Sequence, residues 1–276
     1  MITMKDKRIN GLIILLLMVF SLQAMAANEQ RSYTFGVVPQ QSATKLAKVW
    51  VPVLKNIEKQ TGIKLRFTTA PNIPEFEKRV KAGQYDFSYM NPYHYTVFSK
   101  TPGYRAMAHA RDKRIKGIMV VRKDSTVTKL EELKDQKLAF PSPAAFAASI
   151  LTRGEFSTRN IAIQPDYVSS HDSVYRSVAK GLYPAGGGVV RTFNAVNPLI
   201  HDQLKILWTT PGYTPHAIAS HPDVSSDVVN KITEAFTAMD KTDAGKKLLN
   251  TLKVKGWQKA SDAEWDDVRK LNIELL

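Results

Sequence analysis

The chain has 276 residues, a formal net charge of +14 and no cysteine, and 23% of its residues are charged. The lack of cysteine excludes disulfide bonds, a thiolate nucleophile and a cysteine-linked lipid anchor. Basic residues are interspersed with acidic ones along the chain, as on solvated helix faces. In an exported protein the net charge favours an anionic ligand or an anionic surface over nucleic acid.

The N-terminal residues have the pattern of a secretory signal peptide. The basic segment KDKR at 5–8 precedes an apolar stretch at 11–22, and AMA at 24–26 is a small-x-small cleavage site. The apolar stretch is shorter than the ~20 residues that span a bilayer. We therefore expect removal of residues 1–26 and export of a mature, unlipidated chain to the bacterial periplasm.

Strand and helix patterns alternate through the first part of the mature chain. The predicted strands are YTFGVV (33–38), IKLRF (63–67) and YDFSYM (85–90). Apolar residues at helical spacing predict a first helix that ends at Gly62, and Pro52 is expected to kink this helix or shift its start. The segment PEFEKRVKAG (74–83) predicts a second helix.

The alternation continues through the middle of the chain and changes in the tail. The predicted strands are KGIMVV (116–121), KLAF (137–140), AIQPDYV (162–168), AGGGVVR (185–191) and LKILW (204–208). Helices are expected over 144–153 and 169–181, and residues 225–275 predict three helices without a convincing strand. Such alternation indicates an α/β fold with parallel sheets covered by helices.

Five loops follow the predicted strands. In open parallel sheets, ligands bind at the carboxyl ends of the strands, where helix N-termini offer free N–H groups. The loops that this rule selects are Pro39–Ser42, Tyr89–Tyr93, Pro141–Ala145, Ser169–Ser173 and Val190–Phe193.

The third of these loops belongs to the stretch FPSPAAFAAS (140–149). Ser142 is a suitable N-cap and Pro143 a suitable first helical residue. The alanines behind them would leave the N–H groups of Ala144 and Ala145 open to a ligand. The stretch equally fits a plain capped helix that packs tightly on its sheet, and the sequence leaves both interpretations open.

The strand AGGGVVR also has two interpretations. Its glycines permit close approach of another backbone or of a ligand, or they mark a bulge. Arg191 at its end suits a carboxylate or a phosphate, or it forms an internal ion pair with Asp172 or Asp166. The segment MNPYHY (90–95) combines a turn signal with aromatic side chains that could line a surface.

Catalytic motifs are weak in this sequence. It contains no GxSxG, no HExxH and no cysteine cluster. The segment HDS (171–173) has the letters of a catalytic triad, but adjacent residues cannot face one another as a triad does. His216 and His221 form only a weak zinc pattern. We therefore predict a protein that is not an enzyme and has no cofactor or metal site.

Three motifs in fixed order resemble one known family. FGVVPQQS (35–42), YDFSYMNPY (85–93) and SSHDSVYRSVAKG (169–181), with a Pro-Ser loop between the last two, resemble the periplasmic solute-binding proteins of phosphate, phosphite and phosphonate ABC transporters. The resemblance covers essentially all of the mature chain. It implies a type II periplasmic binding protein, which has two α/β lobes joined by crossing strands and a ligand cleft between the lobes.

The resemblance further implies domain boundaries and ligand contacts. Lobe 1 is expected to comprise residues 30–112 and 213–276, and lobe 2 residues 113–212, with hinges near 111–116 and 209–215. The family's ligand contacts carry over to Gln40, Gln41, Tyr89, Met90, Asn91 and His171. The loops themselves add Tyr93, Ser142, Ala144 and Arg191 as candidate ligand-binding residues.

One loop departs from the family pattern. Phosphonate binders of this group have a Ser-Thr-Ser-like run at the helix start, where this chain has Ser-Pro-Ala-Ala at 142–145. The change leaves one hydroxyl and removes one N–H. We therefore expect a small organic anion rather than free phosphate, with its charge held by Arg191 and His171 and its carbon skeleton against the alanines.

The predicted function is capture of a small anion for an inner-membrane ABC permease. The alternative is a ligand-sensing periplasmic receptor that signals to a membrane sensor kinase or cyclase. In both cases we expect a monomer that does not bind nucleic acid.

Overall fold

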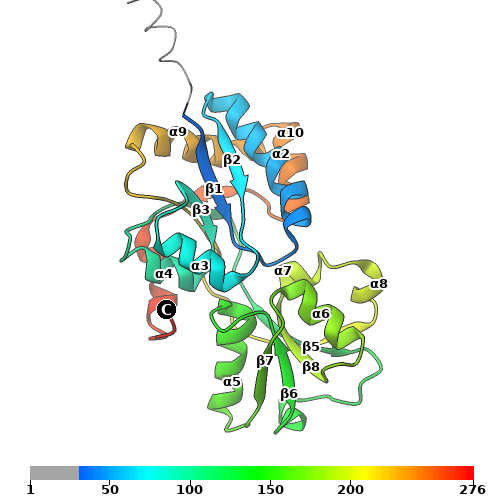
Figure 1. Cartoon of the computed structure of the whole chain (residues 1–276). Helices are drawn as coiled ribbons and strands as arrows, with labels where there is room; N and C mark the ends of the chain where they lie inside the picture. The colour runs from blue at the N-terminus through cyan, green and yellow to red at the C-terminus, as the bar shows by residue number, and fades with distance from the viewer. Residues whose placement is uncertain (1–30) are drawn as a thin grey trace, which may run out of the picture. The chain divides into compact units, whose positions relative to one another are not determined.

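Residues 31–276 are described by the computed structural model, so the predicted signal peptide lies outside the described residues. From Tyr33 onward they form two β-sheets with helices packed on them (Figure 1). Within this range no helix is both long enough and apolar enough to cross a membrane.

The first sheet has six strands in the order β11-β4-β10-β3-β1-β2. Its strands are β1 (Tyr33–Val37), β2 (Leu65–Thr68), β3 (Phe87–Met90), β4 (Arg105–Ala110), β10 (Ala217–Ser220) and β11 (Trp257–Lys259). β1 is parallel to β2 and β3, whereas β10 is antiparallel to β3 and β4, and β11 is antiparallel to β4. The carboxyl ends of β1 and β3 and the beginning of β10 therefore lie at the same edge.

The second sheet has five strands in the order β7-β6-β8-β5-β9. Its strands are β5 (Gly117–Arg122), β6 (Lys137–Phe140), β7 (Gln164–Tyr167), β8 (Ala185–Val189) and β9 (Leu204–Thr209). β6 is parallel to β7 and β8, and β5 is antiparallel to β8 and β9. Both sheets are therefore mixed, where the sequence predicted parallel sheets.

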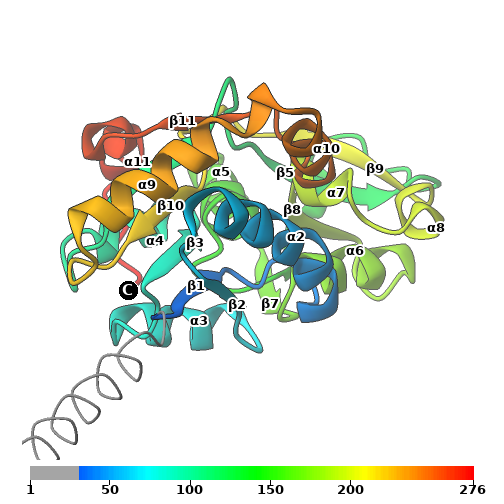
Figure 2. The same ribbon diagram turned by 90° about the horizontal axis from the view of Figure 1, so that it is seen from above.

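Helices connect and cover these strands. The α-helices are α2 (Ala43–Thr61), α3 (Ile73–Lys81), α4 (Pro92–Phe98), α5 (Thr152–Thr158), α6 (His171–Ala179), α7 (Val190–Phe193), α8 (Pro198–His201), α9 (Ser226–Thr237), α10 (Asp243–Leu252) and α11 (Asp266–Arg269). The 3₁₀ turns are η1 (Leu130–Leu133), η3 (Met239–Lys241) and η4 (Asp262–Trp265), and η2 (Phe146–Leu151) is a π-helix. Figure 2 shows α2, α9 and α10 on one side of β1 and β3, and α3 on the other.

An aromatic cluster forms the core beneath α2. The ring of Phe35 in β1 lies 5.4 Å from that of Trp50 in α2 and 6.0 Å from that of Phe236 in α9. Trp50 in turn lies 4.7 Å from Tyr89 in β3. Large buried aromatic side chains dominate the energy of a core. This cluster therefore fixes β3, and with it Tyr89, against α2.

Helix α2 begins and ends where its sequence signals indicate. The side chain of Ser42 accepts a hydrogen bond from the backbone N–H of Lys45, and Gly62 takes the left-handed conformation (φ 71°) typical of a C-terminal cap. Pro52 lies inside the helix, which continues past it. Of our two expectations for Pro52, a kink or a shifted helix start, the shifted start is therefore wrong. The capped start directs the preceding loop, with Gln40 and Gln41, toward the second sheet.

Two chain segments connect the sheets. Residues 111–116 run from β4 to β5, and residues 210–216 return from β9 to β10. Ile115 and Tyr213 form an antiparallel bridge between these segments, with N···O distances of 2.8 and 3.0 Å. The two crossings therefore run side by side as a two-stranded link.

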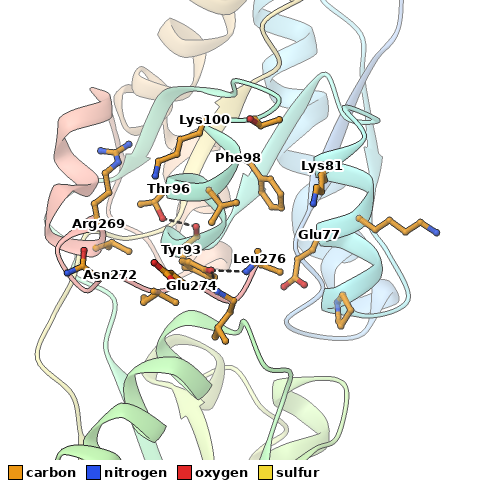
Figure 3. A pocket seen from close by; sticks show the side chains of 17 residues that line it. Glu77, Lys81, Tyr93, Thr96, Phe98, Lys100, Arg269, Asn272, Glu274 and Leu276 are labelled. Atoms are coloured by element: carbon orange, nitrogen blue, oxygen red, sulfur yellow. Dashed lines mark hydrogen bonds between the residues drawn. The ribbon is translucent and has the colours of Figure 1, made fainter.

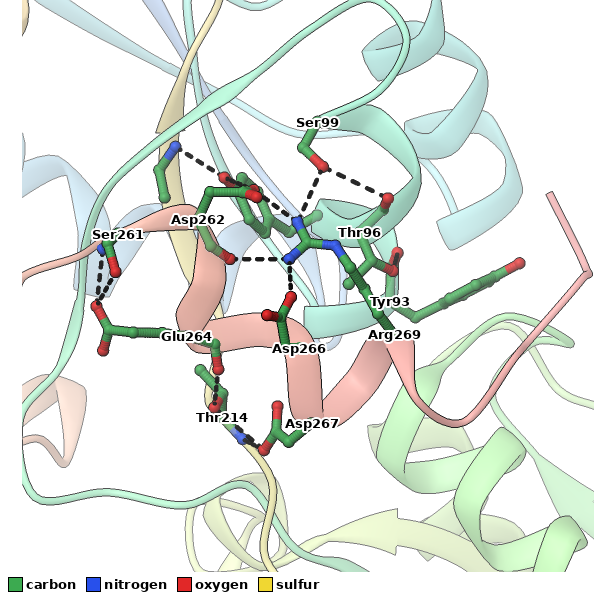
Figure 4. Close-up of polar contacts among 12 residues, drawn as sticks. Tyr93, Thr96, Ser99, Thr214, Ser261, Asp262, Glu264, Asp266, Asp267 and Arg269 are labelled. Atoms are coloured by element: carbon green, nitrogen blue, oxygen red, sulfur yellow. Dashed lines mark hydrogen bonds and ion pairs between the residues drawn. The ribbon is translucent and has the colours of Figure 1, made fainter.

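Asp267 of α11 holds both crossings. Its Oδ2 accepts a hydrogen bond from Arg114 at 2.6 Å and one from the backbone N–H of Thr214 at 2.9 Å. The Thr214 hydroxyl donates to the Glu264 carbonyl at 2.7 Å (Figure 4). The C-terminal residues thus tie the connection to the six-stranded sheet.

The tail and the strand pairing differ from the sequence-based expectations. β11 is a three-residue edge strand in a region that was predicted to be purely helical. Its Trp257 packs on Trp50 and Phe236, a tertiary contact that no local pattern reveals. β4 was not predicted from the sequence.

Candidate ligand-binding site

The loops selected from the sequence meet between the two sheets. The backbone N–H of His171 at the start of α6 donates to the Gln40 carbonyl at 3.1 Å. Asn91 Nδ2 donates to the Ala144 carbonyl at 3.2 Å, and Arg191 donates to the side-chain carbonyl of Gln40. Each of these bonds joins a loop of the six-stranded sheet to a loop of the five-stranded sheet, so five of the candidate residues lie at one junction.

A small cavity of about 10 Å³ lies at the centre of this junction. Gln40, Asn91, His171 and His216 line it together with the segment 145–148. About one water molecule fits into a space of this size. An oxyanion at this point therefore requires the two sheets to move apart.

A larger cavity of about 250 Å³ adjoins the first. The two cavities share Ile115, Val189 and His216 as lining residues. The larger one is also lined by Tyr89 and by five basic residues, but no Asp or Glu is among its lining residues; the basic residues are Lys113, Arg114, Lys116, Arg191 and Lys253. This composition suits an anion.

His171 is held in place as a neutral side chain. It is 1% exposed, and its Nδ1 lies 3.0 Å from Thr192 Oγ1, which lies 2.8 Å from the Tyr175 hydroxyl. Burial, assisted by the nearby charge of Arg191, lowers the pKa of His171 to about 3. At neutral pH this imidazole can therefore offer hydrogen bonds to a ligand but no charge.

His216 is a second buried imidazole at the junction. Its ring stacks on that of Tyr89, with centroids 5.0 Å apart and planes at 21°. The side chain is 4% exposed, and its Nε2 has no hydrogen-bond partner among the described residues. Burial, followed by the charge of Arg191, lowers the pKa of His216 well below its usual value. His216 was not among the candidate residues predicted from the sequence, because it precedes a strand that runs antiparallel to β3.

Further buried polar atoms lack a partner among the described residues. Besides His216, these include Gln41 Nε2 and Ser142 Oγ in residues that are 7% and 2% exposed. Buried polar groups are normally hydrogen-bonded, so each exception calls for an explanation. These three belong to loops at the junction, although buried atoms without a partner also occur elsewhere, as in Ser88 and Ser220, so they are consistent with a polar ligand and do not by themselves locate one.

The stretch FPSPAAFAAS packs on the sheet by its backbone. A Cβ atom on Gly117 would lie 2.0 Å from the Ala147 carbonyl oxygen, and one on Gly187 would lie 1.9 Å from that of Ala148. The small side chains and the glycines therefore let the π-helix lie directly on β5 and β8. Of the two interpretations for the glycines, approach of another backbone is the one that the structure supports.

The N-terminus of that helix differs from the expectation. The first helical residue is Phe146, and the helix starts as a π-helix without a side-chain cap. The Ser142 side chain accepts no hydrogen bond, so the prediction of an N-cap at Ser142 with Pro143 as first helical residue is wrong. Ala144 and Ala145 are each 3% exposed and pack in the core cluster that also contains Tyr89 and Met90.

Arg191 does not form either of the ion pairs that were considered for it. Asp172 pairs with Lys45 at 3.5 Å and Asp166 with Lys137 at 2.8 Å. Arg191 lies in α7, two residues beyond the end of β8, and its guanidinium is bonded to Gln40. Its charge therefore has no carboxylate partner within residues 31–276, and it lines the larger cavity.

Two other candidates lie away from the cavities. Met90 is fully buried and pairs with Ala217 in the sheet. The Tyr93 hydroxyl accepts hydrogen bonds from the backbone N–H groups of Leu275 and Leu276 at 2.7 and 3.0 Å. Figure 3 shows Tyr93 in a separate groove of about 1040 Å³ between α3, α4 and the C-terminal residues. Tyr93 is therefore not part of the site at the junction.

Residues 35–265 match a family model described as the periplasmic substrate-binding protein of phosphonate ABC transporters. Phosphate-import protein PhnD of Mycolicibacterium smegmatis is 22% identical over 229 residues, which cover 74% of this chain and 70% of the relative. The phosphonates-binding periplasmic protein of Escherichia coli is 20% identical over 276 residues, which cover 91% of this chain and 78% of the relative.

Solved structures share the fold. The binding protein component of a phosphonate ABC transporter from Pseudomonas aeruginosa has a TM-score of 0.82 at 18% identity, covering 88% of this chain and 86% of its own. PhnD1 from Prochlorococcus marinus in complex with methylphosphonate has a TM-score of 0.81 at 18% identity, covering 88% and 99%. The predicted fold of a type II periplasmic binding protein is thereby confirmed. Because the family model matches most of its length, this chain belongs to the periplasmic substrate-binding proteins of phosphonate ABC transporters.

Proposed function

We propose that this chain captures a small phosphonate- or phosphate-like anion between its two sheets and presents it to an inner-membrane ABC permease. One observation carries the proposal: the larger cavity at the junction is lined by basic residues and no acidic ones. The names of the relatives agree with it, since one imports phosphate and another binds phosphonates. The proposed contacts are Gln40, Gln41, Tyr89, Asn91, Ser142, His171, Arg191 and His216.

The proposed mechanism is closure of two lobes. Lobe 1 comprises residues 30–112 and 213–276, and lobe 2 comprises residues 113–212, in line with the strands of the two sheets. The crossings at 111–116 and 210–216 serve as the hinge, because they are the segments that connect the two sheets. The ligand enters while the lobes are apart, and bonds such as that from Arg191 to Gln40 form on closure.

A binding experiment tests the proposal. Isothermal titration of the purified mature chain with methylphosphonate and with inorganic phosphate should give saturable binding of at least one of them. The bound anion should raise the melting temperature, because a ligand at 100 times its Kd stabilises the folded state by about 2.7 kcal/mol. Small-angle scattering should show a smaller radius of gyration with the anion present. A folded protein that binds neither anion would contradict the proposal.

Measurement of anion uptake distinguishes transport from the sensing alternative. Deletion of the gene should abolish uptake of the bound anion if the chain serves a permease. Unchanged uptake with a lost transcriptional or second-messenger response would instead support a receptor for a membrane sensor.

We further propose that the mature chain is a periplasmic monomer beginning near Ala27. N-terminal sequencing of the periplasmic fraction and sedimentation analysis would test this.

A further inference from the structure

The basic cavity carries more positive charge than one oxyanion neutralises. Of its five basic side chains, Arg114 alone pairs with a carboxylate within residues 31–276, that of Asp267 at 2.6 Å. Lys113 donates to the carbonyl oxygen of Lys253 at 2.6 Å, and Arg191 donates to Gln40, so both have neutral partners. A phosphate-type group supplies a charge of about −1.5 to −2 at pH 7. Positive charge therefore remains when only such a group is bound.

The charges lie close enough to affect one another. The pKa of Lys113 is lowered by burial and, second, by the charge of Arg191. Lys116 is exposed, and it makes no side-chain hydrogen bond or ion pair with another described residue. An anionic group between these side chains would relieve their mutual repulsion. An ammonium group there would add to it.

The shape of the site provides room for a second group. The small cavity among Gln40, Asn91 and His171 shares the lining residues Ile115, Val189 and His216 with the basic cavity of about 250 Å³. Apolar side chains of Ile115, Val189 and Val254 line this larger space and can contact a short carbon chain. With the two sheets moved apart to admit it, one end of a ligand can lie among the neutral donors while its other end reaches the lysines.

We infer that the site takes a small phosphonate or phosphate ester that carries a second anionic group, such as a carboxylate, and disfavours one that carries an ammonium group. The inference rests on the proposed function and specifies the substrate class of the same site. Selectivity against ammonium comes from like charges, of which only that of Arg114 has a carboxylate partner within residues 31–276. No Asp or Glu is among the described residues that line the cavity.

Three probes of similar size test this inference by titration calorimetry. They are 3-phosphonopropionate, propylphosphonate and 2-aminoethylphosphonate, in which the phosphonate is constant and the other end is anionic, neutral or cationic. We expect affinity to fall in that order, by about tenfold at each step. Equal affinities, or tightest binding of the ammonium compound, would overturn the inference while leaving the proposed function intact. Failure of all three, of methylphosphonate and of phosphate to bind would overturn both.

Variants show whether the lysines cause the preference. Lys116→Gln changes an exposed side chain and should fold normally. It should reduce the preference for 3-phosphonopropionate over propylphosphonate to about threefold and weaken its dependence on salt. Lys81→Gln, in the separate groove beside α3, is the matched control and should leave the preference unchanged. An undiminished preference in Lys116→Gln and in Lys113→Gln would overturn the assignment of the second anionic group to this cavity.

Discussion

The groove beside α3 and the basic cavity at the junction differ in how their charges are balanced. The groove is about four times larger, at about 1040 Å³ against about 250 Å³, and it contains Glu77 and Glu274 beside its basic residues. Its Arg269 is bound to the carboxylates of Asp262 and Asp266 at 2.6 and 2.7 Å (Figure 4). Volume would select the groove as the ligand site, whereas unbalanced charge selects the junction. For an anion-binding protein, charge is the better guide, because a balanced arginine gains little from a further anion.

Replacement of one arginine in each region tests this comparison most strongly. Arg191→Ala should weaken binding of methylphosphonate or phosphate by about 2–4 kcal/mol, because it removes a charge-assisted bond to a buried anion. Arg269→Ala should leave affinity unchanged and lower the free energy of unfolding by about 1–2 kcal/mol, because its bonds are internal. Calorimetry and urea unfolding of both variants provide the measurements. Equal affinities of Arg191→Ala and the parent chain would remove Arg191 from the site.

A second test concerns the backbone contact that keeps the junction tight. Gly187→Ala would place a Cβ atom 1.9 Å from the Ala148 carbonyl, so the π-helix must move, and overpacking of this kind costs about 1–3 kcal/mol. A Cβ atom on Gly154 in α5 would meet no atom within 4 Å, and Gly154→Ala should stabilise the chain by about 0.5–1 kcal/mol. Denaturant unfolding measures both. Similar results for the two variants would show that the close contact has no energetic role.

The sequence predicted the edge of the site through one physical rule. Loops that follow parallel strands gather at the same edge, and that rule selected the loops that contain Gln40, Asn91, His171 and Arg191, which the structure brings together. The family resemblance then named Gln40, Asn91 and His171 within these loops. Tyr93 was selected by the same rule, but it lies two residues beyond Asn91 on α4. Residues two positions apart at the start of a helix point in directions about 200° apart around its axis, so Tyr93 faces the other groove.

The remaining site residues come from segments that the rule does not cover. Lys113 and Lys116 lie in the crossing that leads into β5, and His216 precedes the antiparallel strand β10. These residues come just before a strand, and they lie at this edge because that strand begins there. The direction of a strand is decided by tertiary pairing that the local sequence does not encode. A search of the residues before reversed strands would have found them.

The buried His171 of the junction makes the stability of the chain sensitive to acid. The pKa of His171 is about 3 in the folded chain, against 6.5 for an unperturbed histidine, because of burial and then Arg191. The unfolded chain binds more protons between these pH values, so the free energy of unfolding falls as pH decreases from 6.5 toward 3. For one histidine the loss between pH 6.5 and 5 is about 1.5 kcal/mol.

Unfolding measured at pH 7 and at pH 5 tests this expectation. His171→Gln should lose about 2 kcal/mol less than the parent chain over this range, because the titrating group is gone. His109→Gln is the control, since His109 Nε2 pairs with the Glu264 carboxylate at 2.7 Å and His109 lines neither cavity. If His171→Gln loses as much as the parent chain, His171 does not contribute to the acid sensitivity.

The smallest expected effect concerns Ser142, the one hydroxyl that the loop at 142–145 retains. Its Oγ is buried and has no hydrogen-bond partner among the described residues. If it meets a ligand oxygen, Ser142→Ala should weaken binding of methylphosphonate by about 1 kcal/mol, or about fivefold, because one neutral hydrogen bond is lost. The free energy of unfolding should not fall, because no bond within the protein is removed.

Ser149→Ala is a matched control: its Oγ is also buried without a partner, but it lies in the π-helix beyond the loop. Calorimetry should therefore separate the two serines, while unfolding should not. A loss of stability without a loss of affinity in Ser142→Ala would make this hydroxyl part of the scaffold and leave ligand recognition at this edge to Arg191 and the imidazoles.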